Sequence, residues 1–263
     1  MKEFSSKKVI VLKGTKKQTE KVSEPAGDGL IRLNKYISNA GVCSRRDADK
    51  LISSGMVMIN GEVVTELGRK VTLDDDVQFE GKRLNPERKV YLLLNKPRGF
   101  VTTLDDPHAE RTVMQLIQNA CTERIYPVGR LDMQTTGVLL FTNDGELAKK
   151  LTHPSFEKEK VYHVQLDKDF LPEDLDKLRK GIELEDGFIA VDDIHSIDPD
   201  DARQVGVKIH SGKNRIVRRI FNHLDYQVEK LDRVLFAGLT KKDLPRGRYR
   251  FLTPQEINFL KMS

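Results

Sequence analysis

The chain has 263 residues, of which 38% are hydrophobic and 32% charged, and its formal net charge is +5. This length is enough for one large domain or two ordinary ones. No apolar run approaches the roughly 20 residues that span a bilayer, and lysines interrupt the N-terminus where a secretory signal would be apolar. The two cysteines, Cys43 and Cys121, lie far apart, so neither a disulfide framework nor a structural zinc site is expected. The composition favours a soluble protein of the reducing cytoplasm, without a membrane partner.

Residues 1–29 are rich in lysine, serine and threonine and end in the turn-forming sequence PAGDG. We predict a flexible basic arm, because the segment offers few large apolar side chains to bury. Such an arm either adds sequence-independent attraction to nucleic acid or has no role of its own. The net charge by itself is only weak support for a polyanionic partner.

Two short helices are predicted next. Apolar residues recur at helical spacing from Leu33 onward, and Gly41 ends the pattern. A second helix is predicted to begin at Ser44, which can cap it, while the carboxylate of Asp47 favours the positive helix end. Gly55 ends this helix.

A β-hairpin and a domain boundary are predicted after the second helix. An Asn-Gly dipeptide at 60–61 interrupts the apolar stretch 56–64, which is the strongest short signal for a hairpin. Another strand pair is predicted within 71–79. The segment 85–89 (NPERK) then separates this unit from the rest, so we expect a domain boundary near 80–88.

The remaining chain is predicted to mix strands and helices without a regular βαβ rhythm. Buried strands are predicted at 90–94 and 138–141, a half-buried strand at 160–166, and helices at 113–119, 146–151, 171–180 and 214–221. This order favours an α+β fold. We expect a small domain at 30–80, followed by a larger domain at 88–263 with a mixed, mainly antiparallel sheet.

The stretch 127–137 (PVGRLDMQTTG) precedes the buried strand 138–141 directly. It places an acid, Asp132, near a base, Arg130, where a loop meets the core. Loops on a rigid scaffold are common positions for catalytic groups. The alternative is a loop ion pair without chemistry, and local sequence does not decide between the two.

Three segments of the small domain resemble the S4-type RNA-binding module. They are 32–37 (RLNKYI), 41–46 (GVCSRR) and 55–61 (GMVMING), and the resemblance covers about 30–76. In that module the basic start of the second helix faces RNA phosphates, which a helix N-terminus attracts. The resemblance implies RNA contacts from Arg32, Lys35, Arg45 and Arg46. The alternative for Arg45 and Arg46 is a solvated helix end.

Four segments of the larger domain together resemble the RsuA-type pseudouridine synthases, which carry an S4-type module ahead of the catalytic domain. They are 95–99 (NKPRG), 129–132 (GRLD) with 135–137 (TTG), 160–162 (KVY) and 212–219 (GKNRIVRR). The resemblance covers roughly 30–255 and implies isomerisation of a uridine in RNA to pseudouridine. This reaction involves no redox change and no external group, so neither a cofactor nor a metal is expected.

The resemblance implies three catalytic residues. Asp132 is the carboxylate poised against the ribose–base unit, and whether it attacks the sugar or the uracil ring stays open. Arg218 holds that carboxylate in a fork and keeps it ionised in a partly desolvated cleft. Tyr162 stacks on the target base and is a candidate for proton transfer, unless it is an ordinary core tyrosine. Arg219 is expected to face phosphate, although Arg218 and Arg219 can exchange these roles.

The target base must be flipped out or already unpaired to reach Asp132. Arg130 matches the family's motif arginine, which holds the flipped nucleotide or fills its place; an ion pair is the alternative. Two interpretations are open for Lys96, Arg98, Lys213 and Arg215. They contact RNA phosphates at the rim of the cleft, or they are simply exposed to solvent.

Two departures from the family pattern concern target choice. Ile216 stands where glutamine is common, and Met133-Gln134 replaces a more usual charged pair. The arrangement looks closest to the large-subunit branch (RluB-like), with the small-subunit branch (RsuA-like) second. We therefore expect a monomer that acts on ribosomal RNA, either naked or in an assembling subunit. The alternatives are a non-catalytic RNA-binding or ribosome-assembly factor and a glycosidase-like hydrolase, which would need a second, separately placed acid.

Overall fold

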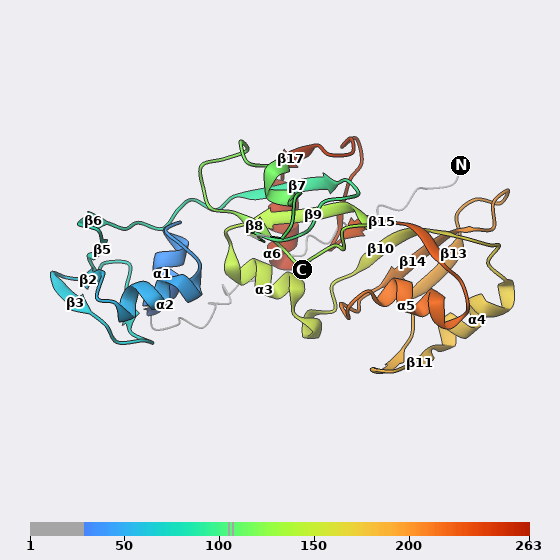
Figure 1. Ribbon diagram of the computed structural model, residues 1–263, viewed down its shortest axis with the longest axis horizontal. Coiled ribbons are helices and arrows are strands. Elements are labelled where there is room, and N and C mark those ends of the chain that lie inside the picture. The colour runs from blue at the N-terminus through green and yellow to red at the C-terminus, as the bar shows by residue number, and fades with distance from the viewer. Residues whose placement is uncertain (1–28, 105, 107) are drawn as a thin grey trace, which may run out of the picture.

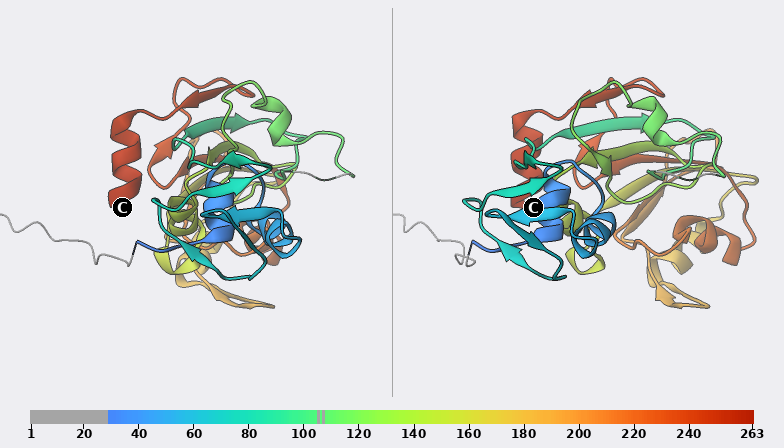
Figure 2. Two further views of the ribbon diagram at one scale, coloured as in Figure 1. Left: turned by 90° about the vertical axis from the view of Figure 1, so that its left-hand side faces the viewer. Right: turned by 60° about the vertical axis from the view of Figure 1, so that its left-hand side comes forward.

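The computed structural model describes residues 29–104, 106 and 108–263, so the predicted basic arm, apart from Gly29, lies outside the described residues. A small unit at one end of the long axis contains α1 and α2, and a larger part is built around a nine-stranded sheet (Figure 1). When the small unit faces the viewer, the larger part lies behind it (Figure 2). Mixed helices and mainly antiparallel strands confirm the predicted α+β class.

The small unit packs two helices against short strands. Leu33, Tyr36 and Ile37 of α1 are buried together with residues of α2. The predicted cap is present, since the Ser44 hydroxyl accepts a hydrogen bond from the Asp47 amide at 3.2 Å. The elements are β1 (Ile31–Arg32), α1 (Leu33–Asn39), α2 (Arg45–Ser53), β2 (Val57–Ile59), β3 (Glu62–Val64), β4 (Lys70–Val71), β5 (Val77–Phe79) and β6 (Lys82–Arg83).

The predicted hairpin is confirmed, because β2 and β3 pair through a turn at Asn60 and Gly61, both with positive φ. The strand pair predicted within 71–79 is wrong. β4 pairs with β1 instead, while β5 lies between β2 and β6. β4 and β1 are distant in sequence, so no local turn pattern revealed that pairing, whereas β5 and β6 form a hairpin through Glu80 and Gly81, both with positive φ.

Polar contacts join the small unit to the larger part. The Glu87 amide, in the segment that connects the two parts, donates to the Asn39 carbonyl of α1 at 2.8 Å. Lys35 of α1 forms an ion pair with Glu146 at 2.6 Å. One of the lysines predicted to bind RNA therefore contacts the larger part of the protein in this structure.

The large sheet has the order β13-β14-β10-β15-β9-β7-β17, with β16 beside β15 and β8 beside β9. Its strands are β7 (Tyr91–Lys96), β8 (Tyr126–Pro127), β9 (Thr136–Thr142), β10 (Lys160–Leu166), β13 (Asp193–Ser196), β14 (Gln204–Ile209), β15 (Val228–Phe236), β16 (Leu239–Thr240) and β17 (Tyr249–Phe251). A separate hairpin joins β11 (Ile182–Leu184) and β12 (Gly187–Ile189). The helices are α3 (Gly145–Thr152), α4 (Pro172–Lys180), α5 (Ile216–His223), α6 (Pro254–Met262) and the 3₁₀ turns η1 (Val113–Leu116) and η2 (Pro154–Phe156).

Among the strands of the described chain, only β9 and β15 pair in parallel, and this pair joins the two halves of the sheet. Gly137 lies opposite Arg233 in this pairing. Its φ is +107°, and a Cβ there would overlap the Arg233 carbonyl oxygen. Glycine is therefore required where the loop 128–135 enters β9.

Each half of the sheet has its own apolar core. One core lies around β10, β14 and α5, and two others cover the β7–β9 half. Two predicted helices differ in extent from the structure. The helix predicted at 113–119 is the four-residue turn η1, and the one predicted at 214–221 begins at Ile216, because Arg215 has a left-handed backbone.

Candidate active site

Asp132 lies in the loop between β8 and β9, and this loop is fixed on both sides of the carboxylate. The Thr102 hydroxyl donates to the Leu131 carbonyl at 2.7 Å, and the Gly99 amide donates to the Met133 carbonyl at 2.8 Å. The Thr135 amide donates to the Asp132 carbonyl at 3.0 Å. The backbone on each side of Asp132 is therefore tied to neighbouring loops, while its side chain keeps 33% exposure.

Lys96 lies beneath this loop and is fully buried. Its ammonium donates to the carbonyls of Thr135 at 2.8 Å and Asp132 at 3.0 Å, with longer contacts to Pro97 and Met133. Burial lowers the pKa of Lys96 to about 8, although the Asp132 charge acts in the opposite direction. The predicted phosphate contact of Lys96 is wrong, because its charged end is enclosed by carbonyls and is out of reach of RNA.

The cation in contact with Asp132 is Arg215, at 3.2 Å between Nη1 and Oδ2. Arg215 precedes α5 with φ of 47°. Arg218, the residue expected in this role, lies in the first turn of α5 and donates to the Val228 carbonyl at 2.6 Å. Burial and the neighbouring Arg215 lower the pKa of Arg218, whereas the charge of Asp132 raises it. The predicted fork between Arg218 and Asp132 is therefore replaced by the contact from Arg215.

One pocket brings together side chains from both halves of the sheet. Tyr162 of β10 is mostly buried and lies directly opposite Arg233 of β15. The predicted site residues that line this pocket are Arg130, Asp132, Tyr162, Lys213 and Arg215. The residues Lys96, Arg98, Arg218 and Arg219 are not part of its lining.

Three basic residues that line the pocket, Lys158, Lys160 and Arg233, were not predicted from the sequence. Arg233 is 3% exposed, and its Nε donates to the Val138 carbonyl at 2.9 Å. Lys160 donates to the carbonyls of Lys158 and His210, and burial, aided by the charge of Arg233, lowers its pKa to about 8. Arg233 lies two residues after Leu231 in β15, so the two side chains face the same, buried side of the sheet. A charged residue at a position expected to be buried is the signal from which its role could have been predicted.

The other predicted RNA contacts are spread over the surface. Arg219 and Lys213 bind Asp186 in the turn between β11 and β12, and Arg98 binds Gln134. Of the RNA contacts predicted in the small unit, Arg32, Arg45 and Arg46 are exposed and Lys35 is partly buried.

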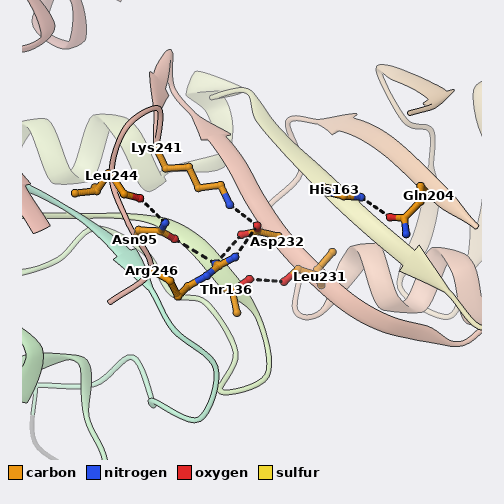
Figure 3. A network of polar contacts seen from close by, with 9 residues as sticks. All are labelled: Asn95, Thr136, His163, Gln204, Leu231, Asp232, Lys241, Leu244 and Arg246. Atoms are coloured by element: carbon orange, nitrogen blue, oxygen red, sulfur yellow. Dashed lines mark hydrogen bonds and ion pairs between the residues drawn. The ribbon is translucent and has the colours of Figure 1, made fainter. Parts of the chain in front are cut away.

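The opposite side of β15 carries a separate polar network (Figure 3). Asp232 pairs with Lys241 and with Arg246, and Arg246 also donates to Asn95 at 3.2 Å. Burial would raise the pKa of Asp232, but hydrogen bonds from Arg246 and Lys241 lower it. The network fastens the segment 241–247 to the sheet. In the described part of the chain, no group of three or more His, Cys, Asp or Glu side chains could hold a metal ion.

Two known protein families match this chain. The RNA pseudouridylate synthase family matches residues 90–223, and the S4 domain family matches residues 31–77. The chain belongs to the RNA pseudouridine synthase family. It is therefore an isomerase whose reaction exchanges the N-glycosidic bond of a uridine for a C-glycosidic bond.

Several proteins resemble this pseudouridine synthase over most of its length. A Bacillus subtilis protein named ribosomal large subunit pseudouridine synthase B is 43% identical, over 88% of this chain and 96% of its own. An uncharacterized RNA pseudouridine synthase of Aquifex aeolicus is 39% identical, over 86% and 92%. A solved pseudouridylate synthase structure is 30% identical with a TM-score of 0.63, covering 88% of this chain and 99% of that one. The recognised family and both predicted domain types are confirmed.

Proposed function

We propose that this enzyme converts a uridine of large-subunit ribosomal RNA to pseudouridine, with Asp132 as its nucleophile. The observation that carries the proposal is the contact of 3.2 Å between Asp132 and Arg215 at a pocket that Tyr162 also lines. The large-subunit target is supported by the name of the Bacillus subtilis relative, and a Pseudomonas aeruginosa relative, 36% identical over 90% of this chain, has the same name.

The geometry suits a carboxylate nucleophile. The hydrogen bonds to the carbonyls around Asp132 fix its direction, and the guanidinium of Arg215 holds its carboxylate by a charge-assisted hydrogen bond. A covalent bond from Asp132 to the nucleotide would divide the exchange of glycosidic bonds into two easier steps. We propose that Arg218 acts on the Asp132 carboxylate as a second, more distant positive charge.

The remaining pocket residues would bind the flipped nucleotide. Tyr162 supplies an aromatic face that can stack on the target base. Because Tyr162 is mostly buried, only a base flipped out of its helix could reach it. Arg130 is exposed at the same pocket and is placed to contact the nucleotide or to fill its vacated position. Lys213 and Arg215 lie at the rim, where phosphates would pass.

The small unit, assigned to 30–80, would capture RNA for the catalytic domain at 88–263. Arg45 and Arg46 are exposed at the N-terminus of α2, where the helix dipole also attracts phosphate. None of the helices in the described residues could cross a membrane. We propose that the enzyme acts as a monomer in the cytoplasm, on ribosomal RNA or on an assembling subunit.

The proposal is tested with Asp132→Asn, and Asp200→Asn in the turn before β14 is the matched control. The target uridine loses its C5 hydrogen, so tritium release from RNA labelled at C5 measures the reaction. We expect Asp132→Asn to lower release from large-subunit RNA about 10³-fold or more, with RNA affinity within about threefold. Release at the wild-type rate would exclude Asp132 as the nucleophile. Release from small-subunit RNA alone would exclude the large-subunit target.

A further inference from the structure

Arg233 is a buried cation that the function proposed above does not use. It lies in the middle of β15, opposite Tyr162 on one side and Gly137 on the other. Side chains directly opposite each other on paired strands share one face of the sheet. Arg233, Tyr162 and Leu231 accordingly line the same pocket as Asp132.

The charge of Arg233 is not neutralised by the described residues. Its Nε donates to the Val138 carbonyl, and its guanidinium lies 4.6 Å from the centre of the Phe236 ring. No Asp or Glu among the described residues forms an ion pair with it, and its Nη2 is buried without a hydrogen-bond partner. Burial lowers the pKa of Arg233, and the Tyr162 side chain, through its charge and a hydrogen bond, acts in the opposite direction.

A buried guanidinium without a counter-ion is costly, since removing a charge from water is repaid only by a partner of opposite charge. Such a group is rare in a folded protein unless something else supplies that partner. Arg233 lies beside a pocket that opens to solvent, so the missing partner can enter from outside. The Thr135 hydroxyl, also at this pocket, is a second buried polar atom without a hydrogen bond among the described residues.

The reaction supplies a group of the right charge. When the bond between C1′ and N1 breaks, its electron pair stays with the base, and the uracil becomes an anion whose charge spreads onto O2 and O4. The ring then bonds to C1′ through C5, loses the C5 proton and gains a proton at N1. If Asp132 adds to the ring instead, the electrons of the double bond move toward O4, so negative charge develops on the uracil along either route.

We propose that Arg233 is a catalytic residue that donates a hydrogen bond from Nη2 to a carbonyl oxygen of the target uracil and stabilises the negative charge that develops there. This inference rests on the proposed function and assigns the base-binding side of its pocket. A fixed donor in a dry site favours the charged transition state over the neutral substrate. Arg233 should therefore affect the chemical step far more than RNA binding.

The test combines Arg233→Met with two RNA substrates, one with uridine and one with 5-fluorouridine at the target position. Fluorine withdraws electrons and stabilises the uracil anion, so this base needs less help from a cation. Single-turnover disappearance of the target nucleoside is measured for both. We expect Arg233→Met to slow the uridine reaction about 10²- to 10³-fold, and the loss on 5-fluorouridine to be at least several-fold smaller.

Arg233→Lys keeps the positive charge and should recover part of the rate, which also provides a measurable variant if Arg233→Met does not fold. Arg203→Met, at an exposed turn pair with Asp201, is the arginine control and should leave both rates unchanged. An equal loss on both substrates in every folded Arg233 variant would mean that Arg233 only supports the structure, and would overturn the inference. A wild-type enzyme that forms no pseudouridine would instead overturn the proposed function.

Discussion

Replacing Lys96 with methionine tests how the protein holds Asp132 in place. Lys96 donates to the carbonyls of Asp132 and Thr135, which lie in the loop between β8 and β9. Methionine has a similar length and is apolar, so it fills the same space without donating a hydrogen bond. The substitution therefore removes the tie while leaving the shape of the core nearly intact.

Two large terms in the free energy of unfolding oppose each other in this variant. Each of the two close carbonyls loses a hydrogen bond to a charged donor, at a cost of about 1.5–3 kcal/mol. Removing the buried ammonium relieves its desolvation, which the fall in the pKa of Lys96 from 10.5 to about 8 sets at about 3 kcal/mol. These two terms leave a net loss of stability of about 0–3 kcal/mol at pH 7. Activity should fall more, about 10- to 100-fold, because the carboxylate is no longer held in register with its substrate.

The pH dependence of stability isolates the contribution of Lys96. Between pH 8 and pH 10.5 the unfolded chain keeps the Lys96 proton while the folded protein releases it, so the unfolded state binds more protons. Stability from this group therefore rises with pH across that window, by up to about 3 kcal/mol. Lys96→Met lacks this gain, and all other groups cancel in the difference.

Urea unfolding of both proteins at pH 7, 8, 9 and 10 measures this difference. The wild-type protein should gain stability relative to the Lys96→Met variant as the pH rises. Parallel curves from pH 7 to pH 10 would show that Lys96 is not a buried, proton-releasing group, and the argument for its role beneath the loop would fail.

Two further predictions concern the strand crossing and the pocket rim. Gly137→Ala should lower the free energy of unfolding by about 3 kcal/mol or more, because a Cβ at φ +107° overlaps the Arg233 carbonyl. Thermal unfolding measures this loss. Gly212→Ala is the control, because a Cβ there would meet nothing within 4 Å. Asp186→Asn should raise RNA affinity several-fold and steepen its salt dependence by about one charge. The Asp186 carboxylate, whose pKa is lowered to about 2 chiefly by Arg219, forms ion pairs with Arg219 at 2.5 Å and with Lys213 at 3.6 Å. Unchanged affinity in fluorescence anisotropy titrations would mean that neither residue contacts phosphate.

The features that could be predicted from sequence are those set by near neighbours along the chain. The cap at Ser44 joins residues three apart, and the Asn-Gly hairpin is decided by two turn residues. The loop that carries Asp132 was predictable because turn residues precede a run of apolar ones. Local chemistry suffices in each of these cases.

The features that could not be predicted depend on pairings between distant segments. Lys96 was expected on the surface because lysine is rarely buried, and only the fold shows that carbonyls 36 and 39 residues away surround it. Arg233 contacts a strand 95 residues earlier. The choice of Arg215 over Arg218 beside Asp132 depends on the left-handed backbone at the start of α5, which no propensity indicated.

The parallel contact between β9 and β15 explains why the site exists where it does. Asp132 enters with the β9 half, and Tyr162 and Arg215 belong to the other half, so their distances depend on how closely these two strands approach. Gly137 permits that approach because it has no Cβ, which would overlap the backbone of Arg233 and push β9 away from β15. A substitution there should change the reaction rate even in a protein that still folds and binds RNA, because it would move Asp132 away from Tyr162 and Arg215 on the other half of the sheet.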